Sequence, residues 1–233
     1  MNKTIAILKR QFLDTLRNKA VLIQFLMFPM MTILMTQAIQ VPNMPPRFFA
    51  ILFATMYIGM APLVVMSSII SEEKEKNTLR VLLFANVKPR EYIIGTGIYV
   101  FVMCMMGSIV FIICGDFKAN EILIFEGIMA AGFVISIFAG ACIGIFSKNQ
   151  MAATAVTVPV MMIFSFVPML SMFNEKIQIV SKLLYTEEIR KLMNSLTEGS
   201  LSVEGSFPAI VLICNGVIVL LVFRMGYKKG FEA

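Results

Sequence analysis

The chain has 233 residues, 58% of them hydrophobic and 15% charged, and its mean hydropathy is +0.85. A soluble domain carries about 25% charged residues, so this composition excludes an ordinary water-soluble fold. The chain has no histidine, which excludes a Ser-His triad and an HExxH zinc site, and it has no G-x-x-x-x-G-K-[ST] sequence to form an ATP-binding P-loop. Its four cysteines stand singly in apolar runs, which favours packing over disulfides or metal ligands.

Residues 1–19 are predicted to form an amphipathic helix. Its apolar face holds Ile5, Leu8, Phe12, Leu13 and Leu16, and a second face holds Lys3, Arg10, Asp14 and Arg17. The charged part is too long for a secretory signal, and no small-residue cleavage site follows it. We expect an elbow helix in the cytoplasmic membrane interface, with its cations among anionic headgroups. The alternative is a plain cytoplasmic extension of the first span.

Six apolar stretches follow, each long enough to cross a bilayer. They cover residues 20–39, 48–70, 91–114, 121–146, 151–173 and 207–223. The proline-rich segment 41–46 separates the first two, and prolines inside the spans are tolerated because neighbouring groups can satisfy the freed carbonyls. The sequence therefore predicts one all-α polytopic membrane domain over residues 1–233.

The loop at residues 71–90 between the second and third spans combines charges with an apolar stripe. Leu79, Leu82 and Leu83 are spaced at i, i+3 and i+4, behind the charged run Glu73–Lys76. A loop retained only for topology would explain the lysines but not the leucines. We therefore predict a compact helix that a cytoplasmic partner can bind.

The fourth span contains two further features. Glu126 is the one acidic residue well inside an apolar segment, and it is expected either to face a transport path or to cap the outer end of this span. Gly140 and Gly144 form a G-x-x-x-G pattern, which allows close helix approach. Packing within the subunit is favoured over dimerisation at this pattern.

The polar stretch at residues 174–206 is also predicted to be helical. Two runs repeat a helical apolar spacing, namely Ile177, Val180, Leu183 and Leu184, then Ile189, Leu192, Met193 and Leu196. We expect two short amphipathic helices lying against the outer membrane interface.

Lysine and arginine placement predicts the orientation. With the N-terminus inside, the cytoplasmic segments hold 14 of the 20 basic residues. The positive-inside rule then places both termini in the cytoplasm, as an even number of spans requires. The net charge of +6 is explained by this topology, so no nucleic-acid partner is expected.

The loop resembles a motif of the ABC-2 type transporter permeases, E-[RK]-E-x-G-T-L-x-x-L-L followed by a turn and a helix start ending in Gly. The matching residues are Glu73, Lys74, Glu75, Thr78, Leu79, Leu82, Leu83, Val87, Glu91 and Gly95. Asn77 replaces the family's glycine, Asn86 replaces a proline near the loop's end, and Arg80 stands where an acidic or amide side chain is common. Asparagine tolerates the left-handed backbone angles of a glycine turn.

This resemblance implies the permease subunit of an ATP-binding cassette exporter, which is a transport subunit and not an enzyme. Two permease copies, as a homodimer or heterodimer, would pair in a bacterial plasma membrane. A separate ATPase subunit would bind ATP and Mg, leaving this chain without a cofactor. The coupling residues it implies are Glu73 and Glu75 as polar contacts, Leu79 and Leu82 as packed ones, with Asn77, Thr78 and Leu83 beside them.

The composition and the acidic residues also bear on the cargo and on two alternative functions. The absence of Trp and the five Tyr favour an amphipathic drug, peptide or lipid over a polysaccharide. A secondary transporter would need paired intramembrane charges, yet Glu126 is the single candidate. A lipid-modifying enzyme would need an acidic cluster that the inner segments lack outside the motif. ATP dependence in reconstituted vesicles separates these alternatives.

Overall fold

The computed structural model describes residues 3–17, 19–39, 45, 47–197 and 207–231. Within these residues helices joined by short turns are the regular structure, and there is no strand. The helices are α1 (Lys3–Arg17), α2 (Lys19–Ala38), α3 (Phe48–Glu75), α4 (Thr78–Phe84), α5 (Pro89–Gly115), α6 (Ala119–Phe146), α7 (Gln150–Ser171), α8 (Glu175–Ser181), α9 (Tyr185–Thr197) and α10 (Phe207–Phe231). Most of the proline-rich break at 41–46, and the end of the outer stretch at 198–206, lie outside the described residues.

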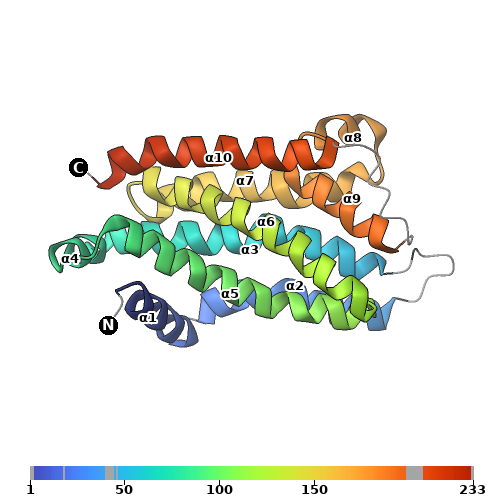
Figure 1. Cartoon of the computed structure of the whole chain (residues 1–233), viewed down its shortest axis with the longest axis horizontal. Helices are drawn as coiled ribbons and strands as arrows, with labels where there is room; N and C mark the ends of the chain where they lie inside the picture. Colours follow the sequence, from blue (N-terminus) through green and yellow to red (C-terminus); the bar gives the residue numbers. More distant parts are fainter. Residues whose placement is uncertain (1–2, 18, 40–44, 46, 198–206, 232–233) are drawn as a thin grey trace.

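Six of these helices are long and apolar enough to cross a membrane, namely α2, α3, α5, α6, α7 and α10. This confirms the predicted all-α polytopic fold. The six helices run along the long axis of the bundle (Figure 1). The elements α1 and α4 and the last turns of α10 lie at one end, and α8 lies at the other.

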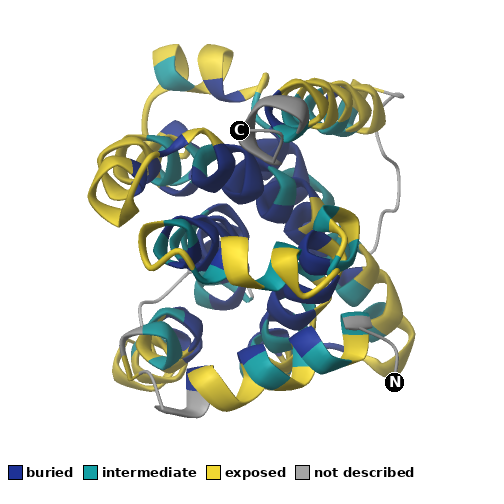
Figure 2. Ribbon diagram, turned by 90° about the vertical axis from the view of Figure 1, so that its left-hand side faces the viewer, coloured by how far each residue is buried: buried dark blue, intermediate teal, exposed yellow. Residues whose placement is uncertain are grey.

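The centre of the bundle is α3, which packs against α2, α5, α6 and α7. Buried residues gather in the middle, and exposed residues cover the outer helices (Figure 2). Many exposed side chains are large and apolar, such as Ile113 on α5 and Ile213 on α10, which are 72% and 65% exposed. Such an exterior suits contact with lipid.

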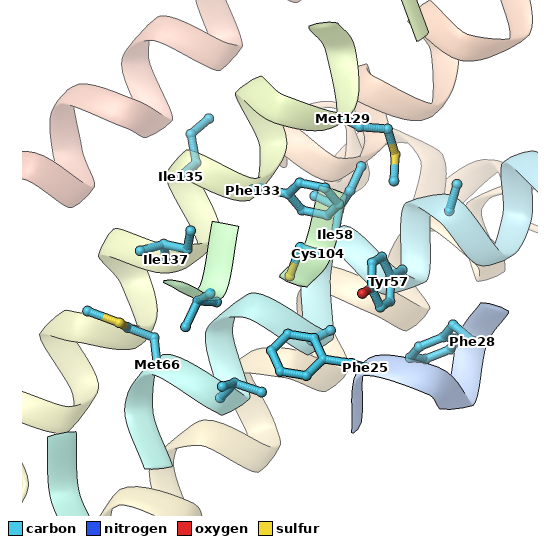
Figure 3. Packing of buried hydrophobic residues seen from close by; sticks show 14 of the residues in the cluster. Phe25, Phe28, Tyr57, Ile58, Met66, Cys104, Met129, Phe133, Ile135 and Ile137 are labelled. Carbon is cyan, nitrogen blue, oxygen red and sulfur yellow. The ribbon is translucent and has the colours of Figure 1, made fainter. Parts of the chain in front are cut away.

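Aromatic packing and close backbone contact hold the core together. The Tyr57 ring of α3 meets the Phe133 ring of α6 edge to face at 5.7 Å between centroids, among the side chains drawn in Figure 3. A Cβ on Gly140 would lie 2.4 Å from the carbonyl oxygen of Leu63. The G-x-x-x-G pattern therefore brings α6 against α3 within this chain, which agrees with the packing interpretation.

Two helices continue beyond the predicted span ends. The helix α3 runs to Glu75 rather than ending near 70, and α10 runs to Phe231 rather than 223. Neither extension contains a proline, and charged residues such as Glu and Lys have good helix propensity. Glu73 and Glu75 thus belong to the end of a spanning helix and not to a separate cytoplasmic helix.

Candidate coupling region and buried polar sites

A two-residue turn separates α3 from the short helix α4. Asn77 adopts φ 56°, the left-handed conformation expected for the glycine that it replaces. Its backbone N–H donates to the Lys74 carbonyl oxygen at 3.1 Å. The exposed Lys76 ammonium, one residue before Asn77, donates a hydrogen bond to the Glu72 carboxylate, and this bond raises the pKa of Lys76. The turn therefore reverses the chain without a glycine.

A Schellman motif ends α4 at Phe84. Asn86 is left-handed at φ 62°, its amide donates to Leu83, and the Val87 amide donates to Leu82 at 3.1 Å. Proline cannot adopt a positive φ. The turn at Asn86 therefore differs from one that has the family's proline at this position. The length of α4 follows from these two left-handed asparagines.

The leucine stripe of α4 packs mainly on its own chain. Leu79 is only 5% exposed and belongs to the hydrophobic core, and Leu82 and Leu83 are half-buried. The side chains presented outward are Val81 and Phe84, which are 63% and 89% exposed. In this structure α4 turns Leu79 toward the bundle, and the contact of the stripe with a partner stays a prediction.

Glu73 faces the amphipathic helix α1 rather than solvent. It is 7% exposed, and its Oε1 accepts from the Gln11 amide at 2.9 Å and lies 3.4 Å from the Arg10 guanidinium. A second bond joins the Thr15 hydroxyl of α1 to the Tyr99 hydroxyl of α5. Glu73 thus fastens α1 to the end of α3, and its role as a polar contact for a partner stays a prediction.

The surroundings of α1 match its sequence pattern in part. Ile7, Gln11 and Thr15 are buried against the bundle, whereas Ile5 and Leu13 are 59% and 47% exposed. A polar cavity of about 270 Å³ lies between α1 and α3, and the half-buried Thr78 lines it. The helix therefore has one face toward protein and an apolar face left free.

Lys74 and Glu75 bind the turn between α6 and α7. The Lys74 ammonium donates to the carbonyl oxygens of Ile145 and Ser147, both at 2.6 Å, where the C-terminus of α6 favours a cation. The Glu75 carboxylate accepts from the Gln150 amide at 2.8 Å, at the N-terminus of α7. Glu75 thus has a partner within the chain, although its side chain remains exposed. The end of α3, which the two-residue turn connects to α4, is thus bonded to α1, α6 and α7.

Glu126 lies inside α6 and bonds to α5. The buried Ser108 hydroxyl lies 2.8 and 2.9 Å from its two carboxylate oxygens. Glu121, and not Glu126, caps this helix, because its carboxylate accepts from the Lys118 amide at 2.9 Å. Glu126 follows the start of α6 by seven residues, about 10 Å along the helix, so the alternative that it caps the outer end is wrong.

The structure also shows a buried ionic cluster on α9. Glu187 is fully buried and receives two bonds from Arg190, at 2.7 and 3.1 Å, and one from Ser171 at 3.0 Å. Glu188 is 1% exposed and pairs with Lys191 at 2.6 Å. All four charges are therefore neutralised within one helix.

This helix enters the bundle instead of lying on its outer surface. It packs against α3, α6, α7 and α10. The Tyr185 hydroxyl at its start bonds to Ser136 at 2.7 Å, and Ser136 lies past the midpoint of the 28-residue helix α6. The prediction of two helices against the outer interface is therefore wrong for α9, whereas α8 keeps Ile179 and Val180 largely exposed.

The fold and these sites define a polytopic helical membrane protein with an exposed helical tip at one end and a re-entrant helix at the other. Comparison with family models matches the chain to the ABC-2 family transporter protein over residues 2–223. The chain belongs to this family, and it is a membrane-spanning permease component of an ABC transporter. Such a component is not itself an ATPase and associates with an ABC ATPase subunit. No curated protein matches the sequence.

Proposed function

We propose that the chain is the permease subunit of an exporter that moves an amphipathic drug, peptide or lipid outward. A separate subunit would hydrolyse ATP, and two permease copies would pair in a bacterial plasma membrane. Family membership supports the transport role. The helix α4 is exposed, and the charged residues at the end of α3 beside it are bonded to other helices. This arrangement supports α4 as the element through which the ATPase subunit moves the membrane helices.

The orientation we propose puts the α4 end in the cytoplasm. The coupling loop at that end holds five basic residues, Lys74, Lys76, Arg80, Lys88 and Arg90. At the opposite end Arg47 pairs with Glu121 at 2.9 Å. The positive-inside rule counts lysine and arginine near the membrane ends and favours the cytoplasm for the end that holds more of them. In this orientation the exposed apolar face of α1 faces the inner leaflet.

The ATPase subunit would dock on the outward side of α4. Val81 and Phe84 offer an apolar patch, and the exposed Arg80 offers a charge beside it. Phe84 is the side chain to bind in a pocket, because large aromatic residues dominate most protein interfaces. Movement of α4 would pass through Lys74 and Glu75 into α6 and α7, since these bonds leave little freedom between the helices.

Co-purification of the ATPase subunit tests this proposal. Phe84→Asp places a charge in the docking pocket and should remove most of the bound ATPase, while the permease still inserts. Phe173→Asp is the matched control, because Phe173 is 73% exposed near the opposite end of the bundle, just after α7. Retention of the ATPase by Phe84→Asp at the level of the control would rule out α4 as the docking site.

Glu126 has a proposed place on the transport path. A carboxylate inside a membrane helix is costly, and such groups usually face protein or water. Its bond to Ser108 supplies a protein partner and leaves the residue half-buried. We assign it the outer part of the path, where it would contact a polar group of the cargo.

A further inference from the structure

A groove on the side of the bundle has no part in the proposals above. It has a volume of about 370 Å³ and lies between α5 and α10, with α6 and α3 as its floor. Met66 and Ile137, both visible in Figure 3, form part of this floor. Ile94 and Ile98 on the α5 wall are 53% and 42% exposed, so the groove opens to the side, toward lipid.

The groove has the length of one membrane leaflet. Its α5 wall runs from Arg90, in the first turn of that helix, to Phe101. The eleven helical steps from Arg90 to Phe101 cover about 16 Å. The hydrocarbon core of a bilayer is about 30 Å thick, so one leaflet contributes about 15 Å. A lipid chain lying in the groove would therefore reach from the headgroup region to the middle of the membrane.

The groove surface is almost wholly apolar, and one basic residue, Arg90, lies with Tyr227 at its membrane-surface end. None of the described residues that line the groove is acidic. Arg90 is exposed and forms no ion pair with any carboxylate in the described part of the chain. The exposed Lys88 lies two residues earlier. A guanidinium binds phosphate with paired hydrogen bonds, and basic pockets between membrane helices bind anionic headgroups.

We propose that this groove binds one anionic phospholipid of the adjacent leaflet, with an acyl chain between α5 and α10 and its phosphate at Arg90. In the proposed orientation this is the cytoplasmic leaflet. The site is separate from the α4 surface, and lipid binding does not require the ATPase subunit. A negative result for lipid binding would therefore not contradict the proposed transport function. A negative result for ATPase docking would likewise not contradict the lipid site.

The chain has no tryptophan, so a single introduced one reports on a single place. Phe101→Trp puts the probe at the deep end of the groove, and Leu123→Trp puts it on an open surface of α6 that is 81% exposed. The full chain is reconstituted into mixed vesicles of phosphatidylcholine and phosphatidylglycerol. In one set the phosphatidylglycerol carries brominated acyl chains, and in the other set the phosphatidylcholine carries them. Quenching by bromine gives the relative affinity of each site for the two lipids.

We expect the Phe101→Trp probe to prefer phosphatidylglycerol about fivefold, the ratio that corresponds to about 1 kcal/mol for one cation at an anionic surface. The Leu123→Trp probe should show no preference. Adding Arg90→Gln should remove the preference, and this exposed residue can be changed without disturbing the core. Gly97→Leu should weaken quenching by both lipids, because a Cβ there meets only Ile137, at 3.6 Å, and the longer side chain enters the groove.

A matched control is Gly127→Leu, since a Cβ on Gly127 meets nothing within 4 Å; this change should not alter the Phe101→Trp probe. Equal quenching by the two lipids at Phe101→Trp would overturn the proposal, as would a preference that survives Arg90→Gln. A Phe101→Trp probe that neither lipid quenches, while Leu123→Trp is quenched, would also overturn it, because a second copy of the chain would then cover the groove.

Discussion

The ionic cluster on α9 allows a quantitative test of where that helix lies. Arg190→Met removes the guanidinium that donates to both oxygens of Glu187 and keeps a flexible side chain in its place. Glu187 is 0% exposed and Arg190 is 8% exposed. The substitution therefore leaves a buried carboxylate with the Ser171 hydroxyl as its remaining partner.

Burial decides the size of the effect. An exposed ion pair contributes about 0.2–1 kcal/mol, whereas breaking a buried pair costs about 3–5 kcal/mol because one charge is left uncompensated. We expect the larger value for Arg190→Met. The double variant Glu187→Met and Arg190→Met replaces both charges by apolar side chains, so it should recover most of the lost stability.

The free energy of unfolding is measured by titrating the purified chain with sodium dodecyl sulfate in mixed micelles and following helix content by circular dichroism. Lys76→Met serves as a comparison, because the side chains of the Lys76–Glu72 pair are 66% and 31% exposed, so losing this pair should cost less. A loss below about 1 kcal/mol for Arg190→Met would show that water reaches the pair. The helix would then lie at the outer interface, as its sequence pattern predicts, and the re-entrant placement would be refuted.

Three further predictions concern the bundle and its orientation. Gly140→Ala should destabilise the chain by about 1–3 kcal/mol in the same titration, because its Cβ meets the α3 backbone, whereas Gly127→Ala should not. Glu126→Gln keeps an acceptor for Ser108 and should assemble normally but change transport per ATP hydrolysed; unchanged transport would make this residue structural. In a cysteine-free background, Phe173→Cys should react with an impermeant thiol reagent from outside and Phe84→Cys should not, and the opposite pattern would reverse the proposed orientation.

The six spans could be predicted because each depends on local composition alone. Long apolar runs cross the membrane whatever their neighbours are. The placement of α9 could not be predicted in this way, because its sequence Tyr185–Lys191 contains four charged residues and looks interfacial. The Glu187–Arg190 and Glu188–Lys191 pairs at i, i+3 are a signal in the sequence. They indicate that charges can be neutralised, but only the surrounding helices show that they are buried.

The sequence predicted that the coupling region is helical, but it could not predict which side of the helix faces the bundle. Spacing identified the stripe of Leu79, Leu82 and Leu83, yet periodicity cannot say whether a stripe packs on its own chain or on a partner. The same limit applies to Glu73 and Glu75, since a charged run gives no sign of contacts with α1 and α7 that are distant in sequence. The left-handed turn at Asn77, by contrast, follows from the residue type.

The depth of α9 has a consequence for how the protein is assembled during synthesis. A helix of 13 residues is too short to cross a bilayer, and its charges would resist entry into lipid by itself. It can reach Ser136 only after α3, α6 and α7 have been inserted, and α10, which follows it in the chain, then packs beside it. Docking of α9 therefore follows insertion of α3, α6 and α7, and a chain arrested before α10 would leave uncovered the side of α9 against which α10 packs.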